Sequence, residues 1–390
     1  MHRYSKRLPW SNPPNTFSRL LAERRRASEP LLDLTISNPT QVFADYPHAQ
    51  IKAVYDAVAD FRYNPDPLGQ ACARESIAGW YAKKGVPVSP AHLALTASTS
   101  EAYSLLFKLL CNPGDEVLIP VPSYPLFEHL ALLESVKIVP YRLVYDGSWF
   151  VDFTSLRSGI SPRTRAIVIV NPNNPTGSFL KRNEKERLFE IAREHTLPIV
   201  SDEVFMDFPL EPAREQVPTL IGHDEVLSFS LNGLSKSAGM PQMKLGWIAI
   251  NGPAEAREIA SERLELLLDT YLSVATPVQN ALEGLLSVGT GFHETISARL
   301  KRNKSALESS HASPVNVLKA EAGWSAILQV PNVLPEDEWI AKLLAEYQVV
   351  AQPGYFFDMT AEAYLIVSLI TPPEDFAEAI QRIRLLAERL

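Results

Sequence analysis

The sequence has few cysteines, no clustered histidines and no long apolar run, and each shortage excludes a class of protein. Only Cys72 and Cys111 occur among 390 residues, and without paired spacing they exclude a disulfide framework and a thiolate zinc site. The eight histidines are scattered singly, so no metal site is expected. Apolar runs such as residues 166–170 are far shorter than the roughly 20 residues of a membrane helix. We therefore expect no membrane partner.

An excess of positive charge is also missing. The chain has 37 basic and 45 acidic residues, for a net charge of −8, which is opposite in sign to a nucleic-acid binder. The amino terminus has charge but no apolar segment typical of a secretory signal, so we expect a cytoplasmic location. The chain contains 46% hydrophobic and 21% charged residues, which is the composition of a globular protein. Its 31 prolines indicate many defined loops.

The order of predicted elements indicates an α/β fold. Residues 1–50 read as an irregular arm with a short strand at 31–36. From about residue 97 to 250, apolar strands alternate with helices, which predicts a mainly parallel sheet covered on both faces; the strands are at 117–121, 166–170, 199–201 and 226–230, and the helices at 100–110 and 181–195. After Pro277 come long helices, strands at 325–330 and 365–370, and a closing helix. This change in the arrangement of helices and strands predicts a second, smaller α+β domain.

Three polar groups follow successive predicted strands. Asn174 lies in the Asn-Pro-Asn-Asn-Pro-Thr-Gly segment after residues 166–170, Asp202 ends the next strand, and Lys236 follows the strand at 226–230. Each alone has an ordinary reading, as a Pro–Asn turn, a helix cap or a surface lysine. Together they are expected at the carboxyl edge of a parallel sheet, where ligands bind.

An amide, a carboxylate and a lysine at one edge match the needs of pyridoxal 5'-phosphate. Lys236 would form the Schiff base, Asp202 would keep the pyridine nitrogen protonated, and Asn174 would hydrogen-bond the phenolic oxygen. Hydroxyls at the start of a predicted helix, Ser98, Thr99 and Ser100, suit the phosphate, although N-capping also explains them. Tyr124 could stack on the pyridine ring or be a core or interface aromatic.

The chain resembles, over nearly its whole length, the class I/II aminotransferases of the fold-type I pyridoxal phosphate superfamily. The motifs quoted above occur in the family's order and at matching separations. The resemblance implies a homodimer with active sites at the subunit interface. It also implies a large cofactor-binding domain at residues 51–276, and a small domain built from 277–390 together with the 1–50 arm.

Further site residues follow only from this resemblance. It implies that Tyr63 reaches the partner subunit's cofactor phosphate, that Ser235 beside Lys236 binds cofactor, and that Ser37 and Asn174 contact substrate. No metal is implied.

Three positions depart from the family pattern. Phe205 stands where a tyrosine commonly donates to the phenolic oxygen, and Lys244 replaces the arginine that clamps the phosphate with a bidentate fork. Ile366 aligns with the arginine that binds the substrate carboxylate, and no arginine lies between Arg302 and Arg382. Either an arginine of the amino-terminal arm, such as Arg3 or Arg19, binds that carboxylate, or the substrate is recognised differently.

The function that the sequence favours is amino-group transfer between an amino acid, or an amine, and a 2-oxo acid, with Lys236 and Asp202 as catalytic residues. A β-elimination or carbon–sulfur lyase on the same fold is the alternative, because the motifs around Lys236 serve both reactions. A non-catalytic ligand-binding regulator is a remote alternative, since no DNA-binding segment precedes residue 30.

Overall fold

The computed structural model describes residues 4–10, 15–212, 215–309, 313–359, 361 and 363–390. No helix in these ranges is long and apolar enough to cross a membrane. The same ranges contain no cluster of His, Cys, Asp or Glu side chains that could hold a metal ion.

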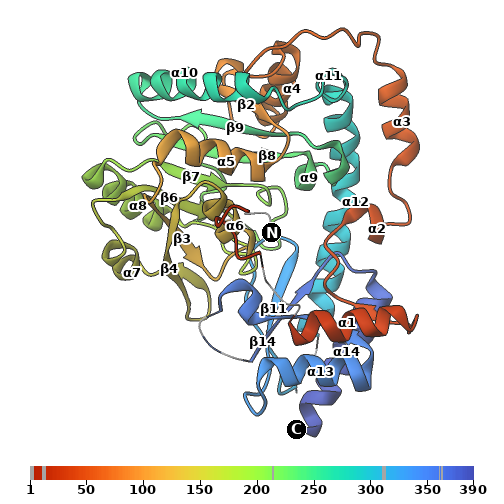
Figure 1. Cartoon of the computed structure of the whole chain (residues 1–390). Helices are drawn as coiled ribbons and strands as arrows, with labels where there is room; N and C mark the ends of the chain where they lie inside the picture. Colours follow the sequence, from red (N-terminus) through yellow and green to blue (C-terminus); the bar gives the residue numbers. More distant parts are fainter. Residues whose placement is uncertain (1–3, 11–14, 213–214, 310–312, 360, 362) are drawn as a thin grey trace.

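The largest element is an eight-stranded sheet with the order β2-β9-β8-β7-β6-β3-β4-β5 (Figure 1). Strands β8, β7, β6, β3 and β4 run parallel, whereas β9 and β5 run antiparallel to their neighbours. This arrangement confirms the α/β class with a mainly parallel sheet. The strands are β2 (Leu93–Thr96), β3 (Glu116–Val121), β4 (Lys137–Tyr145), β5 (Trp149–Val151), β6 (Thr164–Val170), β7 (Ile199–Asp202), β8 (Ser228–Gly233) and β9 (Gly246–Asn251).

Successive strand residues point to opposite faces, and both faces are buried. In β6, Val168 packs in one apolar cluster and Ile167 in another. The first face is covered by α5 (Thr99–Leu110), α6 (Leu126–Leu133) and α10 (Ala254–Tyr271), and the second by α7 (Phe153–Ser158) and α8 (Arg182–His195). The continuous apolar runs of these strands follow from burial on both sides.

A smaller sheet lies at the carboxyl-terminal part of the chain, with the order β10-β11-β14-β13. Its strands are antiparallel and comprise β10 (Asn316–Val317), β11 (Ser325–Gln329), β13 (Gln352–Pro353) and β14 (Tyr364–Ser368). The amino-terminal arm joins this region, because β1 (Leu32–Asp33) pairs with β12 (Val349–Val350) and α1 (Thr16–Arg26) contacts α13 (Glu336–Tyr347). The two chain ends therefore pack together, although the exact division into domains stays a prediction.

The remaining helices link the two sheets. The long helix α12 contacts both α4, beside the large sheet, and α14, beside the small one. The bounds of these helices are α2 (Pro39–Val42), α3 (His48–Asp56), α4 (Ala71–Ala82), α9 (Leu234–Ser237), α11 (Thr276–Asn280), α12 (Leu282–Glu308) and α14 (Pro373–Arg389), with 3-10 turns η1 (Pro90–His92), η2 (Pro241–Met243) and η3 (Gly354–Phe357).

The predicted elements occur with shifted ends. The strand expected at 226–230 begins at Ser228 and continues to Gly233, because it pairs with β9 through Gly233 and Gly246. The strand expected at 31–36 has only two residues, and Asn38 caps α2 shortly afterwards by accepting a hydrogen bond from the Thr40 amide. Pairing with β9 thus sets the end of β8, whereas the chain after β1 enters a locally capped helix.

Candidate active site

A cavity of about 380 Å³ opens at the carboxyl edge of the large sheet. Val170, Asp202 and Leu231 are aligned in register across β6, β7 and β8, so the segments that follow these strands meet at one edge. The second wall comes from the amino-terminal arm and the small sheet, which contribute Ser37, Ser325 and Ile366 among others.

The structure brings nearly all predicted site residues to this cavity. Those that line it are Ser37, Ser98, Thr99, Ser100, Tyr124, Asn174, Asp202, Phe205, Ser235, Lys236, Lys244 and Ile366. Tyr63 is the exception: its side chain is 75% exposed and borders a separate depression beside Leu268 and Leu272. Within one subunit, Tyr63 therefore does not line the cavity.

Lys236 is a buried amine on α9, directly after β8. Its Nζ lies 5.0 Å from the ring centroid of Trp324 and 5.6 Å from that of Phe205. Burial lowers the pKa of Lys236 to about 8, and the negative charge of Asp202 opposes this shift. A neutral amine, the nucleophilic form, is thus available near neutral pH.

Asp202 is a buried carboxyl at the end of β7. Burial raises the pKa of Asp202 to about 6, while the Val204 amide, the Tyr103 hydroxyl and the charge of Lys236 act in the opposite direction. Tyr103 donates to Oδ2 at 3.2 Å, and the Val204 amide donates to Oδ1 at 3.3 Å. Sequence reasoning missed Tyr103, because nothing in a helix residue 99 positions earlier marks it as a partner of Asp202.

The next residue, Glu203, is also buried but does not line the cavity. Its carboxylate accepts hydrogen bonds from the Ser201, Thr219 and Ser230 hydroxyls and from the Leu220 amide, at 2.6 to 3.0 Å. Burial raises the pKa of Glu203 to about 7, and these donors oppose the shift. Glu203 therefore serves as a structural carboxylate beside a cavity-lining one.

At the start of α5, the hydroxyls of Ser98, Thr99 and Ser100 are compatible with both helix capping and phosphate binding. The Ser98 Oγ accepts a hydrogen bond from the Glu101 amide at 3.1 Å, which is the N-capping role. Thr99 and Ser100 nevertheless face the cavity, and amides in the first turn of a helix have no intrahelical partner and favour an anion. Lys244, exposed and in the left-handed region at φ 50°, lines the same space.

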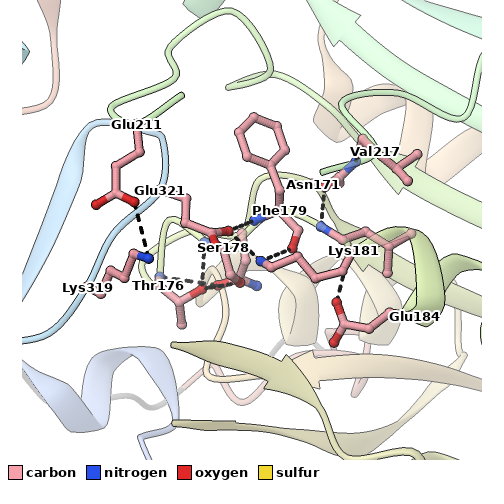
Figure 2. A network of polar contacts seen from close by, with 12 residues as sticks. Asn171, Thr176, Ser178, Phe179, Lys181, Glu184, Glu211, Val217, Lys319 and Glu321 are labelled. Atoms are coloured by element: carbon pink, nitrogen blue, oxygen red, sulfur yellow. Dashed lines mark hydrogen bonds and ion pairs between the residues drawn. The ribbon is translucent and has the colours of Figure 1, made fainter. Parts of the chain in front are cut away.

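The Asn-Pro-Asn-Asn-Pro-Thr-Gly loop is held by a polar network that Figure 2 shows. Asn171 accepts from the Leu180 amide at 2.8 Å and donates to the Val217 carbonyl at 2.7 Å. Glu321 accepts from the Phe179 amide at 2.9 Å and from Lys181 Nζ at 2.5 Å. The network ties the loop after β6 to the segment between β10 and β11.

The backbone of the same loop also packs closely against the segment between β10 and β11. Gly177 has φ +69°, and a Cβ there would lie 2.4 Å from the Ala322 carbonyl oxygen, so only glycine fits. Two residues beyond this contact, Trp324 enters the cavity wall, and Ser325 Oγ donates to Asn174 Oδ1 at 3.1 Å. The network therefore positions Asn174 and part of the opposite wall together.

Several lining residues had no signal in the sequence. They come from the arm, the small sheet and the turns beside it, and include Thr35, Trp324, Ser325, Gln352, Phe357 and Ser368. The two arginines considered for a substrate carboxylate gain no support. Arg19 is exposed on α1 and does not line the cavity, and Arg3 lies outside the described residues.

The residues present fit pyridoxal phosphate. The cavity has room for a small aromatic ring with a phosphate, and it presents a buried amine, a buried carboxyl and a helix N-terminus with hydroxyls. Each of these groups suits a different part of the cofactor.

Comparison with known proteins identifies the family. The family model for class I and II aminotransferases matches residues 29–383. The chain is 32% identical over 282 residues to the glutamate-pyruvate aminotransferase AlaA of Escherichia coli, covering 71% of this chain and 68% of that protein. It is 27% identical to human tyrosine aminotransferase, covering 92% and 81%. The structure of an alanine aminotransferase from Pyrococcus furiosus superposes with a TM-score of 0.87 at 25% identity, covering both chains fully.

The chain therefore belongs to the class I and II aminotransferases. It is a pyridoxal phosphate-dependent enzyme of amino-group transfer with the fold of that family.

Proposed function

We propose that this enzyme moves an amino group between an amino acid or amine and a 2-oxo acid, with Lys236 and Asp202 as its catalytic residues. The observation that carries the proposal is the pairing of a buried amine and a buried carboxyl in one cavity. The pKa of Lys236 is lowered to about 8 and the pKa of Asp202 is raised to about 6, both mainly by burial. Such perturbed groups are typical of acid–base and nucleophilic sites.

The chain's own residues then have distinct tasks. Lys236 would attach the cofactor covalently through its amine and, once released, would move the proton at the amine-bearing carbon of the substrate. Asp202 would hold the pyridine nitrogen with a charge-assisted hydrogen bond, and the Tyr103 hydroxyl, which donates to its Oδ2, would orient it. When bound, pyridoxal phosphate supplies an electron sink for that proton transfer.

The remaining lining residues bind and orient. Asn174, whose Oδ1 accepts from Ser325, would have its amide hydrogens available for the phenolic oxygen, and the Tyr124 ring would pack on the pyridine. The phosphate is assigned to Lys244 and four hydroxyls, those of Ser98, Thr99, Ser100 and Ser235. Phe205 contributes an apolar edge beside the ring, and Ser37 contacts substrate.

The active form is proposed to be a homodimer in which Tyr63 reaches the partner subunit's cofactor phosphate. Exposed apolar side chains support this: Phe61, Tyr63, Leu266 and Tyr271 are large and solvent-exposed, and Tyr63 borders one depression with the end of α10. Burying such side chains against a second subunit would remove apolar area from water. Sedimentation of the purified enzyme tests the dimer, and a Tyr63→Phe variant with weaker cofactor retention tests the contact. A cytoplasmic location and the domain limits stay predictions.

The direct test of the function is a half-reaction on the purified, cofactor-loaded enzyme. Each amino acid or amine is added without acceptor, and the visible absorbance of the cofactor is followed. We expect the band to disappear with one equivalent of oxo product formed and no ammonia released, followed by its return when a 2-oxo acid is added. Release of ammonia with each turnover would instead support the elimination reaction.

A further inference from the structure

Tyr103 is a buried tyrosine whose hydroxyl reaches the carboxyl of Asp202. Its side chain is only 3% exposed, and its hydroxyl donates a hydrogen bond to Asp202 Oδ2 at 3.2 Å. The Val204 amide donates to Oδ1 at 3.3 Å. Among the residues that the structure describes, no other side chain donates a hydrogen bond to this carboxyl. Because Tyr103 is buried within one subunit, this contact does not depend on which surface a partner covers.

The helix α5 connects this hydroxyl to the proposed phosphate site. Thr99 and Tyr103 are four residues apart in α5, so they lie on the same face of the helix, about one turn apart. Thr99 lines the cavity at the start of the helix, whereas Tyr103 packs in the apolar cluster between α5 and the sheet and reaches Asp202. One rigid element therefore serves two parts of the cofactor, its phosphate and its ring nitrogen.

Aromatic packing holds the Tyr103 ring in place. Its centroid lies 6.0 Å from that of Phe107, at an interplanar angle of 45°, and 5.0 Å from that of Phe127, at 84°. Burial raises the pKa of Tyr103 well above its usual range, and the negative charge of Asp202 raises it further. The hydroxyl therefore stays protonated at neutral pH, where it can only act on the Asp202 carboxylate as a donor.

We infer that Tyr103 is a positioning residue that keeps Asp202 ionised, so that the proton shared between Asp202 and the ring nitrogen of pyridoxal phosphate stays on the nitrogen. The inference rests on the proposed function and adds a control of charge to the orientation of the carboxyl. A hydrogen bond to the charged form of a carboxyl favours that form, and this bond opposes the burial that raises the pKa of Asp202 to about 6. Without it, more Asp202 would be neutral near pH 7 and would lose the charge that holds a protonated nitrogen.

Two cofactors that differ only at the ring nitrogen separate this role from packing. Pyridoxal 5'-phosphate and its 1-deaza analogue, in which a C–H group replaces the nitrogen, are titrated into the cofactor-free, full-length enzyme at neutral pH. We expect the wild type to prefer pyridoxal phosphate, and Tyr103→Phe to reduce this preference about tenfold. Tyr141→Phe is the matched control, because Tyr141 is 1% exposed and its hydroxyl donates to the Val168 carbonyl at 2.8 Å. The control should keep the wild-type preference.

The pH dependence of this preference is the second measurement. The preference should fall as the pH drops through the pKa of Asp202 in the cofactor-free enzyme, because a proton then competes for the carboxylate. In Tyr103→Phe the midpoint should move to higher pH by about half a unit or more. Replacing Tyr103 with 3-fluorotyrosine, a stronger donor, should move the midpoint to lower pH. This second substitution decides the question if Tyr103→Phe does not fold.

The outcomes distinguish the inference from the function on which it rests. An unchanged preference in Tyr103→Phe, with both cofactors bound equally more weakly or as tightly as before, overturns the inference and leaves the role of Asp202 intact. A wild type that binds the two cofactors equally well overturns the role proposed for Asp202, and the inference with it. A midpoint that stays at the wild-type pH in both Tyr103 substitutions also contradicts a control of charge.

Discussion

The two ends of the cavity differ in where their residues come from. The cofactor end is built on one sheet, with Asp202 at the end of β7, Lys236 just after β8 and the hydroxyls at the start of α5. The substrate end is assembled from the amino-terminal arm and the small sheet. The first is charged and the second neutral. Chemistry common to the family is therefore carried by local strand ends, whereas the substrate preference depends on distant segments packed against them.

Burial acts on both charged groups of the cofactor end in the same way. It favours the neutral form of each, lowering the pKa of Lys236 and raising that of Asp202, while their opposite charges favour ionisation of both. The described residues that line the substrate end include no such pair of charged side chains. The following variants test this contrast between the two ends.

The largest effect is expected at Lys236. Lys236→Ala should retain cofactor through ring and phosphate contacts but lower turnover by about a thousandfold or more, because both the covalent attachment and the proton carrier are lost. Borohydride reduction of the loaded wild-type enzyme, followed by peptide mapping, identifies the attached lysine. A label on Lys244, the other lysine of the cavity, would contradict the assignment.

The next effect separates two adjacent carboxyl groups. Asp202→Asn should lower turnover on the order of a hundredfold or more and weaken cofactor binding, since it removes the charge that holds the pyridine nitrogen. Glu203→Gln is the matched control, because Glu203 is the adjacent carboxyl, is fully buried and does not line the cavity. Cofactor affinity and kcat are measured for both. Equal losses in the two variants would show that Asp202 acts only structurally.

Glu203 itself predicts a pH-dependent stability. Its pKa is raised to about 7 in the folded protein from the usual 4.5, so folding favours the protonated side chain. The stability that this protonation adds to the folded state is fully present below about pH 4.5 and is lost as the pH rises through about 7. The glutamine of Glu203→Gln does not titrate. The free energy of unfolding of this variant, relative to that of the wild type, should therefore rise by about 3 kcal/mol between about pH 4 and pH 8. Urea unfolding across this range measures the difference. A constant difference would exclude titration of Glu203.

The smallest effect is expected at the contact between the two ends. Glu321→Gln keeps an acceptor for the Phe179 amide but leaves Lys181 without its buried charge partner, so the segment that carries Trp324 and Ser325 should loosen. We expect KM for the amino donor to rise about threefold to tenfold with cofactor affinity unchanged. Glu211→Gln, from the more exposed ion pair with Lys319, is the control. A loss of cofactor affinity in Glu321→Gln alone would indicate a wider role.

The cofactor end could be predicted residue by residue because each group follows a recognisable strand or begins a helix. Asn174, Asp202 and Lys236 were all expected at one sheet edge, and all line the cavity. Tyr103 could not be predicted, since it meets Asp202 only through the packing of α5 on the sheet. Trp324 and Gln352 likewise could not be predicted, because no motif in the surrounding sequence marks either residue as part of a cavity wall.

The sequence by itself determined the alternation of strands and helices, the polar groups after each strand and the lack of an arginine near Ile366. These depend on neighbours a few residues apart, so hydrophobic periodicity and side-chain chemistry express them directly. The tertiary structure alone decided which segments face each other. It closed the arm and the small sheet over the large one, placed Glu321 on Lys181, and put Ile366 rather than a cation in the cavity wall. Such contacts join residues more than a hundred positions apart, where no local preference in the chain specifies the partner.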